Sequence, residues 1–236
     1  MAALLFISFI VLLLIGVPVA FAIAAAALLV LLKGDVKLLI LVQRMFASTD
    51  SFSLIAVPFF IFAGDLLAKG KVSKVLVEFA ESLLGMLKGG LSIVSVLAGM
   101  FFAAISGSAA TAAVGATLIP ELKKRGYRED SAAALIAAAG TIGVVIPPSV
   151  PMVLYAVISE DSVNTLFKNG FIPGILMGVI LVAISLYQAR KFNYPKGKAF
   201  SVGNVLHTFK EAIWGILMPL IILGGIFSGY FTPSEA

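Results

Sequence analysis

Three long runs without a charged residue constrain this chain more than any other feature. They are Met1–Leu32, Gly89–Pro120 and Ser131–Ser159. Each exceeds the roughly 20 residues that an α-helix needs to cross a hydrocarbon core about 30 Å thick. Composition agrees, because 61% of the residues are apolar and 12% are charged, against roughly 45–50% and about 25% in soluble domains. The sequence therefore predicts an all-α polytopic membrane protein.

The sequence lacks the residue groupings that most enzyme sites require. Cysteine is absent, so neither a disulfide framework nor a thiolate metal site is available. There is no phosphate-binding loop, Cys/His cluster or Ser/His/Asp set, and the single histidine, His207, is not expected to be catalytic or to bind a metal. The net charge of +5 comes from short basic clusters beside apolar runs, which is typical of topogenic charge. We expect no enzymatic activity.

About six segments are predicted to span the membrane. The first has Gly16 and Pro18 in mid-run, and it is too long for a cleavable signal. The third is the weakest, because charged residues interrupt it. Two further stretches are amphipathic, and the earlier one is predicted to lie along the interface as an arm. The spans are Ala2–Leu32, Ser51–Leu67, Val72–Leu87, Ser131–Ser159, Phe171–Tyr187 and Ala212–Phe231, and the amphipathic stretches are Val36–Phe46 and Val202–Glu211.

The run Gly89–Pro120 is too long to be one ordinary span. As a single helix its 32 residues would measure about 48 Å. Split at Ser106-Gly107-Ser108, its arms would be roughly 22 Å and 18 Å, each short of the hydrocarbon thickness. Lys88 precedes the run and a basic cluster follows it, so both ends favour the cytoplasmic side. This pattern predicts a re-entrant helical hairpin with its tip at membrane depth.

The run Ser131–Ser159 is predicted to be a helix broken near its middle. It contains Gly140-Thr141-Ile142-Gly143, followed by Pro147-Pro148-Ser149-Val150-Pro151. Consecutive prolines remove hydrogen-bond donors and clash with the preceding turn. A continuous helix is therefore not expected here.

Basic residues give a topology with one conflict. Placing the basic clusters inside puts the N-terminus outside, the arm inside, and the hairpin entering from the cytoplasm. Lys69, Lys71 and Lys74 then fall on the external side. If Val72–Leu87 lies on the surface instead, the N-terminus is internal and the violators become Lys33, Lys37 and Arg44.

Paired interruptions of this kind are typical of secondary transporters, whose sites use half-helix ends near the midplane. Unwound backbone offers carbonyl oxygens to a cation such as Na⁺, and helix N-termini offer N–H groups to an anion. In the hairpin, Ser106, Ser108 and Thr111 supply hydroxyl groups, and Gly107 allows a close approach. The alternative is that these small residues only allow close helix packing. The double proline in the companion break favours a site.

Intramembrane acids are the other candidates, because charge is costly in lipid. Asp65 lies beside Lys69 and is expected to form an exposed pair with it. Glu78 and Glu81 are expected to face the interface or a neighbouring subunit.

The chain resembles the large membrane subunit of the tripartite ATP-independent periplasmic (TRAP) transporters. Several motifs carry the resemblance together and in order along the whole chain. They are Ile15-Gly16-Val17-Pro18-Val19-Ala20-Phe21-Ala22, Ala56-Val57-Pro58-Phe59-Phe60-Ile61-Phe62-Ala63-Gly64, Ile105-Ser106-Gly107-Ser108-Ala109, Leu118-Ile119-Pro120-Glu121, Ile146-Pro147-Pro148-Ser149 and Phe231-Thr232-Pro233-Ser234-Glu235-Ala236.

The resemblance implies the first half of an inverted-repeat, elevator-type permease in the bacterial inner membrane. It implies Na⁺-driven uptake of an organic acid, such as a C4-dicarboxylate or a sialic acid, from a periplasmic binding protein. Its other partners would be a small membrane subunit and the C-terminal half of the large subunit, because the chain holds only one hairpin and one broken helix. The implied division is scaffold in 1–88, transport domain in 89–160 and scaffold in 161–236.

The resemblance also implies which residues form the site. The Na⁺ ligands would come from Ser106, Gly107, Ser108, Gly140, Thr141, Val145 and Pro147, and the substrate contacts from Ser108, Thr111, Pro148 and Ser149. No cofactor other than the coupling ion is expected. Two alternatives stay open, namely a single-component anion transporter of similar hairpin architecture and a non-transporting membrane scaffold.

Overall fold

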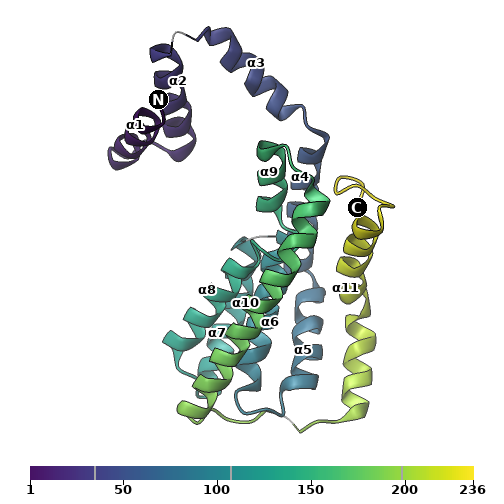
Figure 1. Ribbon diagram of the computed structural model, residues 1–236. Helices are drawn as coiled ribbons and strands as arrows, with labels where there is room; N and C mark the ends of the chain where they lie inside the picture. The colour runs from purple at the N-terminus through teal and green to yellow at the C-terminus, as the bar shows by residue number, and fades with distance from the viewer. Residues whose placement is uncertain (35, 107, 198) are drawn as a thin grey trace. The chain divides into compact units, whose positions relative to one another are not determined.

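The computed structural model is built of helices that fall into two units, Met1–Ser51 and Phe52–Ala236 (Figure 1). It describes the backbone of residues 1–34, 36–106, 108–197 and 199–236, and the side chains of these residues except 68, 69 and 105–113. Each unit is described by itself.

The N-terminal unit contains two short helices where one spanning helix was predicted. Helix α1 (Ala2–Leu14) and helix α2 (Val19–Lys33) pack against each other, and Ala22 and Ala26 are buried between them. Gly16 has φ +89°, and Pro18 is the N-cap of α2. Each helix is only about 20–22 Å long at about 1.5 Å per residue. The prediction of one continuous helix over Ala2–Leu32 is therefore wrong, because the glycine and proline turn the chain back.

Helix α3 (Leu38–Thr49) forms over the predicted amphipathic arm. None of its residues is buried, and Leu39, Met45 and Phe46 are among its exposed apolar side chains. Its place at a membrane interface stays a prediction.

In the residues that the structure describes, the second unit begins with a short 3₁₀ turn, η1 (Phe52–Ile55), and continues with eight α-helices. Two of the helices, α10 and α11, are by themselves long and apolar enough to cross a membrane, judged over the described residues. The helices are α4 (Ala56–Lys69), α5 (Lys71–Leu84), α6 (Gly90–Ser106), α7 (Ser108–Lys124), α8 (Glu129–Ile142), α9 (Val150–Ser159), α10 (Val163–Lys191) and α11 (Val202–Ser228).

Helices α4 and α5 lie end to end along α11, joined at Gly70 (Figure 1). The contacts run in antiparallel order. The hydroxyl of Thr208 donates to that of Ser82 across 3.0 Å, and Gly215 faces Val72 and Leu76. Further along α11, Ile222 and Ile226 share a core with Ala56 and Phe60 of α4.

This arrangement differs from the two separate segments that the sequence predicted. The segments Ser51–Leu67 and Val72–Leu87 were predicted as two spans. In the structure, α4 and α5 instead form one interrupted rod, because Gly70 between them is extended, with ψ 175°, and does not reverse the chain. Lys71 and Lys74 accordingly lie along that rod and not in an external loop. The charge conflict of the predicted topology depended on such a loop.

One face of α10 packs against the rest of the unit at positions three or four residues apart. A Cβ at Gly178 would lie 2.3 Å from Met100 Cε, and the hydroxyl groups of Ser92 and Ser185 are 2.7 Å apart. Small residues allow helices to approach closely. The buried positions are Val163, Phe167, Gly170, Gly174, Gly178, Leu181, Ser185 and Ala189.

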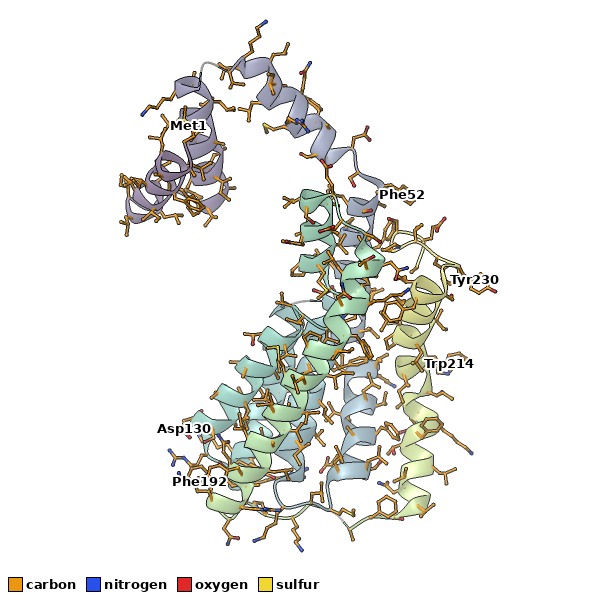
Figure 2. The ribbon with its side chains drawn as sticks, in the orientation of Figure 1. Met1, Phe52, Asp130, Phe192, Trp214 and Tyr230 are labelled. Atoms are coloured by element: carbon orange, nitrogen blue, oxygen red, sulfur yellow. The ribbon has the colours of Figure 1, made fainter. Side chains whose placement is uncertain are left out.

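The basic loops meet at one end of this unit. Figure 2 shows Asp130 and Phe192 at that end, and Phe52 and Tyr230 at the other. The rings of Tyr127 and Tyr194 stack with centroids 4.3 Å apart. The structure thus brings together the basic clusters that the sequence assigned to one side of the membrane.

Candidate functional site

The predicted hairpin is present as two helices packed side by side. Leu91 near the start of α6 and Leu122 near the end of α7 belong to the same core, together with Phe102 and Val114. This pairing requires the helices to be antiparallel, so residues 89–120 do not form one unbroken rod. Gly107 and the side chains of Ser106, Ser108 and Thr111, which were predicted to bind ion and substrate, lie outside the described residues.

The predicted broken helix is also present. Helix α8 ends at Ile142 and α9 begins at Val150. Pro147, Pro148 and Ser149, which connect the two helices in the chain, are buried. The proline-rich break is therefore confirmed.

The break begins later than predicted. Gly140 and Thr141 were expected in unwound backbone, but both lie in the last turn of α8. Thr141 is exposed, and its Oγ1 donates to the carbonyl of Ala138 across 2.8 Å. The helix continues through Gly140 because one glycine costs a helix only about 1 kcal/mol. Whether Gly140 and Thr141 bind an ion stays a prediction.

Gly143 brings the two interruptions together. A Cβ at this position would lie 2.2 Å from Ala103 Cβ, 2.3 Å from the carbonyl carbon of Ala103 and 2.6 Å from the backbone nitrogen of Ala104. The start of the break therefore touches the backbone of α6 only two to three residues before that helix ends at Ser106. The sequence contained Gly143 within a glycine pair, but no signal in it identified Ala103 as the partner.

Helix α10 holds the break from the other side. A Cβ at Gly170 would lie 2.6 Å from the carbonyl oxygen of Val145, and one at Gly174 would lie 2.4 Å from Ile146 Cγ1. The Ser149 hydroxyl donates to the carbonyl of Val144 across 2.7 Å, and this hydrogen bond joins the two ends of the segment between α8 and α9. Residues 143–149 are thus fixed between α6 and α10.

The charges at this junction come from helix ends. The C-termini of α6 and α8 meet here, each with a partial negative charge equivalent to about half an electron, and α7 begins at Ser108 with the opposite sign at its N-terminus. The N-terminus of α9, with the opposite sign, begins at the other end of the break. Among the described residues, no group of three or more acidic or histidine side chains can hold a metal. Backbone and hydroxyl oxygens suit a hard monovalent cation.

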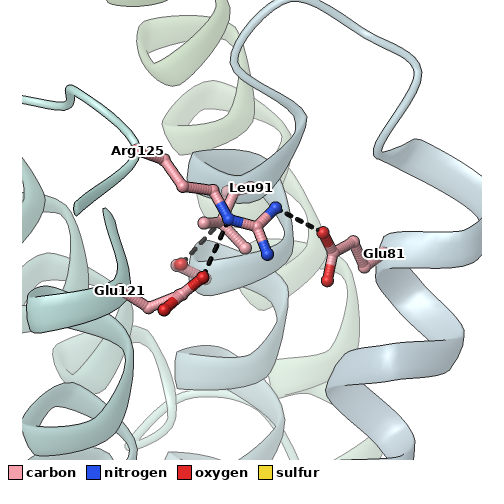
Figure 3. Close-up of polar contacts among 5 residues, drawn as sticks. Glu81, Leu91, Glu121 and Arg125 are labelled. Carbon is pink, nitrogen blue, oxygen red and sulfur yellow. Dashed lines mark hydrogen bonds and ion pairs between the residues drawn. The ribbon is translucent and has the colours of Figure 1, made fainter. Parts of the chain in front are cut away.

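Away from this junction, an ion-pair cluster joins the base of the hairpin to α5 (Figure 3). The guanidinium of Arg125 donates to Glu81 across 2.6 Å and to Glu121 across 2.9 Å. The hydrogen bond to Glu81 is the largest cause that raises the pKa of Arg125. Glu81 was expected to face the interface or another subunit, but it binds within its own chain.

The remaining polar candidates lie at the surface, where His207 is exposed and Glu78 is partly exposed. Glu78 lies 3.9 Å from Lys74, and His207 lies 3.8 Å from Glu211. Asp65 is exposed as expected, whereas the side chain of its predicted partner Lys69 lies outside the described residues.

The fold and the junction together define an all-α membrane protein in which a helical hairpin meets a broken helix. This is the arrangement that secondary transporters use to build sites from helix ends. The sequence profile of the tripartite ATP-independent periplasmic transporter DctM component matches residues 6–236, and the chain belongs to this family. Its members are transporter permease subunits and not enzymes.

Curated relatives match nearly all of the chain. It is 42% identical to a C4-dicarboxylate TRAP transporter large permease protein of Vibrio cholerae, over 99% of the chain and 52% of the relative. It is 41% identical to the 2,3-diketo-L-gulonate TRAP transporter large permease protein of Escherichia coli, over 94% of the chain and 53% of the relative. It is 38% identical to a sialic acid TRAP transporter permease protein of Haemophilus influenzae, over 94% of the chain and 36% of the relative. The chain thus spans about half the length, or less, of these relatives.

Proposed function

We propose that this chain is the N-terminal part of a permease that takes up an organic acid with Na⁺ as the coupling ion. The observation that supports this proposal best is the contact of Gly143 with Ala103 and Ala104, because it brings the C-termini of α6 and α8 together. The carbonyl oxygens freed at these two helix C-termini favour a positive charge between them. A bound Na⁺ would supply that charge.

The substrate site is proposed beside this cation. The N-terminus of α9 offers a positive dipole end, and Pro148 and Ser149 precede it. A carboxylate placed there would interact with both the helix end and the bound ion. Relatives named for C4-dicarboxylate, 2,3-diketo-L-gulonate and sialic acid transport support an organic acid as the substrate class.

The working transporter is proposed to need further parts. These are a small membrane subunit, a periplasmic binding protein and a second half with its own hairpin and broken helix. Residues 89–160 would move as the transport domain of an elevator in the inner membrane, with 1–88 and 161–236 as scaffold. The family description, a tripartite periplasmic transporter, supports this assembly.

Uptake into proteoliposomes tests the proposal. The vesicles would contain the complete permease and its membrane partner, with the binding protein outside and a radiolabelled acidic solute. We expect uptake that needs both an inward Na⁺ gradient and the binding protein. Uptake unchanged when K⁺ replaces Na⁺ would remove the coupling, and uptake without the binding protein would favour a single-component anion transporter.

Serine variants test the hairpin tip. Ser106→Ala and Ser108→Ala should each raise the Na⁺ concentration for half-maximal uptake by roughly tenfold, since a lost ligand to a charged group costs about 1.5 kcal/mol. Ser159→Ala is the matched control, because its hydroxyl only donates to the carbonyl of Tyr155. Equal Na⁺ dependence in all three variants would show that the tip hydroxyls do not bind the ion.

A further inference from the structure

The chain turns back sharply after α11. The amide of Gly229 donates to the carbonyl of Ile226 and that of Tyr230 to the carbonyl of Gly225. With φ +82° at Gly229, this is the Schellman motif that ends many helices. The ring of Phe231 then lies on Gly225, where an added Cβ would overlap it. The residues after the turn are therefore held against the end of α11.

Residues 232–236 form the first turn of another helix. The amide of Thr232 donates to Oε2 of Glu235 across 2.8 Å, which is one half of a capping box. Pro233 follows the cap, at the first helical position, where its missing N–H is not needed. The amide of Ala236 donates to the carbonyl of Thr232 across 3.1 Å, and this bond between residues four apart has the pattern of an α-helix. These contacts make Thr232 the N-cap of a helix.

This turn forms one wall of an apolar groove along α4. The hydroxyl of Ser234 donates to the carbonyl of Phe52 across 2.7 Å, which fixes the turn beside the start of η1. The groove has a volume of about 360 Å³, and its α4 wall includes Phe59, Phe62 and Leu66. These three side chains are spaced along one face of the helix and are 61%, 62% and 57% exposed. An apolar face of α4 is thus left open next to the new helix start.

We propose that the segment after Ala236 continues as a helix and packs into this groove. The inference rests on the proposed function in one respect, namely that the complete permease has a second half. The chain corresponds to the N-terminal half of its full-length relatives and covers 52% of the one from Vibrio cholerae. At about 1.5 Å per residue, the first two turns of the helix would reach from Phe59 to Leu66.

A continuation of this chain fits the groove better than a separate partner. Residues 233–236 already form one of the walls, so the next residues reach the groove without a long loop. Covalent attachment also makes the packing intramolecular, and it raises the effective concentration of the segment to about the millimolar range. The facing side of the helix would carry apolar residues at positions three or four apart.

Disulfide trapping in the complete permease tests the docking. Residues 1–236 contain no cysteine, so Phe59→Cys or Leu66→Cys would be combined with single cysteines at successive positions after Ala236, in a background without other cysteines. Mass spectrometry of the linked peptides gives the extent of each disulfide. We expect Phe59→Cys to link at positions three or four apart. Leu66→Cys should link at positions about seven residues later, because the helix runs along α4.

Ile61→Cys is the matched control, because Ile61 lies on the same helix and is 49% exposed but does not line the groove. It should link several-fold less than Phe59→Cys. Equal linkage from Ile61→Cys, linkage without the helical spacing, or no linkage from Phe59→Cys and Leu66→Cys in folded protein would overturn the proposal.

Photocrosslinking identifies any other occupant. Benzoylphenylalanine in place of Phe62 should capture mainly the segment after Ala236. Capture of mainly lipid or the small membrane subunit would assign the groove to that occupant and overturn the proposal. Both measurements are made without transport, so their failure and the failure of Na⁺-coupled uptake are separate results.

Discussion

Replacing Gly143 with alanine tests the junction on which the proposed cation site depends. The added Cβ would lie 2.2 Å from Ala103 Cβ and 2.3 Å from the carbonyl carbon of Ala103. One of these atoms belongs to the backbone of α6, so a change of side-chain rotamer cannot relieve the overlap. Overpacking of this kind typically costs about 1–3 kcal/mol. We expect the break to move away from α6 and the two helix C-termini to separate.

The assay is the Na⁺ dependence of the melting temperature of the purified permease. A ligand that binds only the folded state stabilises it by RT ln(1 + [L]/Kd), which is about 2.7 kcal/mol at a ligand concentration about 100 times Kd. Wild-type protein should therefore melt at a higher temperature in Na⁺ than in K⁺ of equal ionic strength. Gly143→Ala should melt at a lower temperature than the wild type in K⁺. In addition, it should lose most of the rise in melting temperature that Na⁺ gives the wild type.

Two further variants make this experiment specific. Gly224→Ala is the control, because a Cβ there meets nothing within 4 Å and alanine favours a helix by about 1 kcal/mol. Ala103→Gly added to Gly143→Ala should restore little, since the overlap with the backbone carbon of residue 103 persists. If Gly143→Ala keeps the full Na⁺ response, the contact between α6 and the break does not build the cation site.

Three other predictions follow from named contacts. Glu81→Gln should destabilise the protein by about 1 kcal/mol, the scale of a partly exposed pair, as read from thermal melts; an equal loss when Arg125 is already Gln would show that the pair contributes nothing. Gly170→Ala should reduce expression and melting temperature more than Gly178→Ala, because the first Cβ meets the carbonyl oxygen of Val145 and the second meets the flexible end of Met100; the reverse order would contradict this. The hydrogen bond from Arg128 is the largest cause of the lowered pKa of Asp130. The stabilisation by this pair is therefore present above the ordinary pKa of 3.8 and is lost as the pH falls below it. Arg128→Gln should raise the pKa of Asp130 in an NMR titration, and an unchanged pKa would exclude the pair.

Much of the fold was predictable because it depends on local chemistry. Uncharged runs longer than a bilayer is thick can only be helical in lipid, since every backbone polar group must be satisfied internally. Pro147 and Pro148 break a helix wherever they occur, and the break was confirmed. The hairpin followed from the length of the run, from its Ser106-Gly107-Ser108 break and from the basic residues at both ends, because a rod of about 48 Å does not fit.

The errors arose where a break in the helix leaves two geometries open. Gly16 and Pro18 could kink one helix or reverse the chain, and the structure shows α2 packed against α1. Gly70 could join two antiparallel spans or two collinear helices, and the contacts with α11 decided for the second. Hydropathy reports the length of each segment but not its direction after a break.

By itself, the sequence determined that this chain is a helical membrane protein with two interrupted helices, because charge, length and proline act on a few residues at a time. Tertiary structure alone decided which groups meet. The contact of Gly143 with Ala103, the pair of Arg125 with Glu81 and the hydrogen bond of Ser234 to Phe52 each join positions from separate elements. Such contacts depend on how whole helices pack, which no short stretch of sequence specifies.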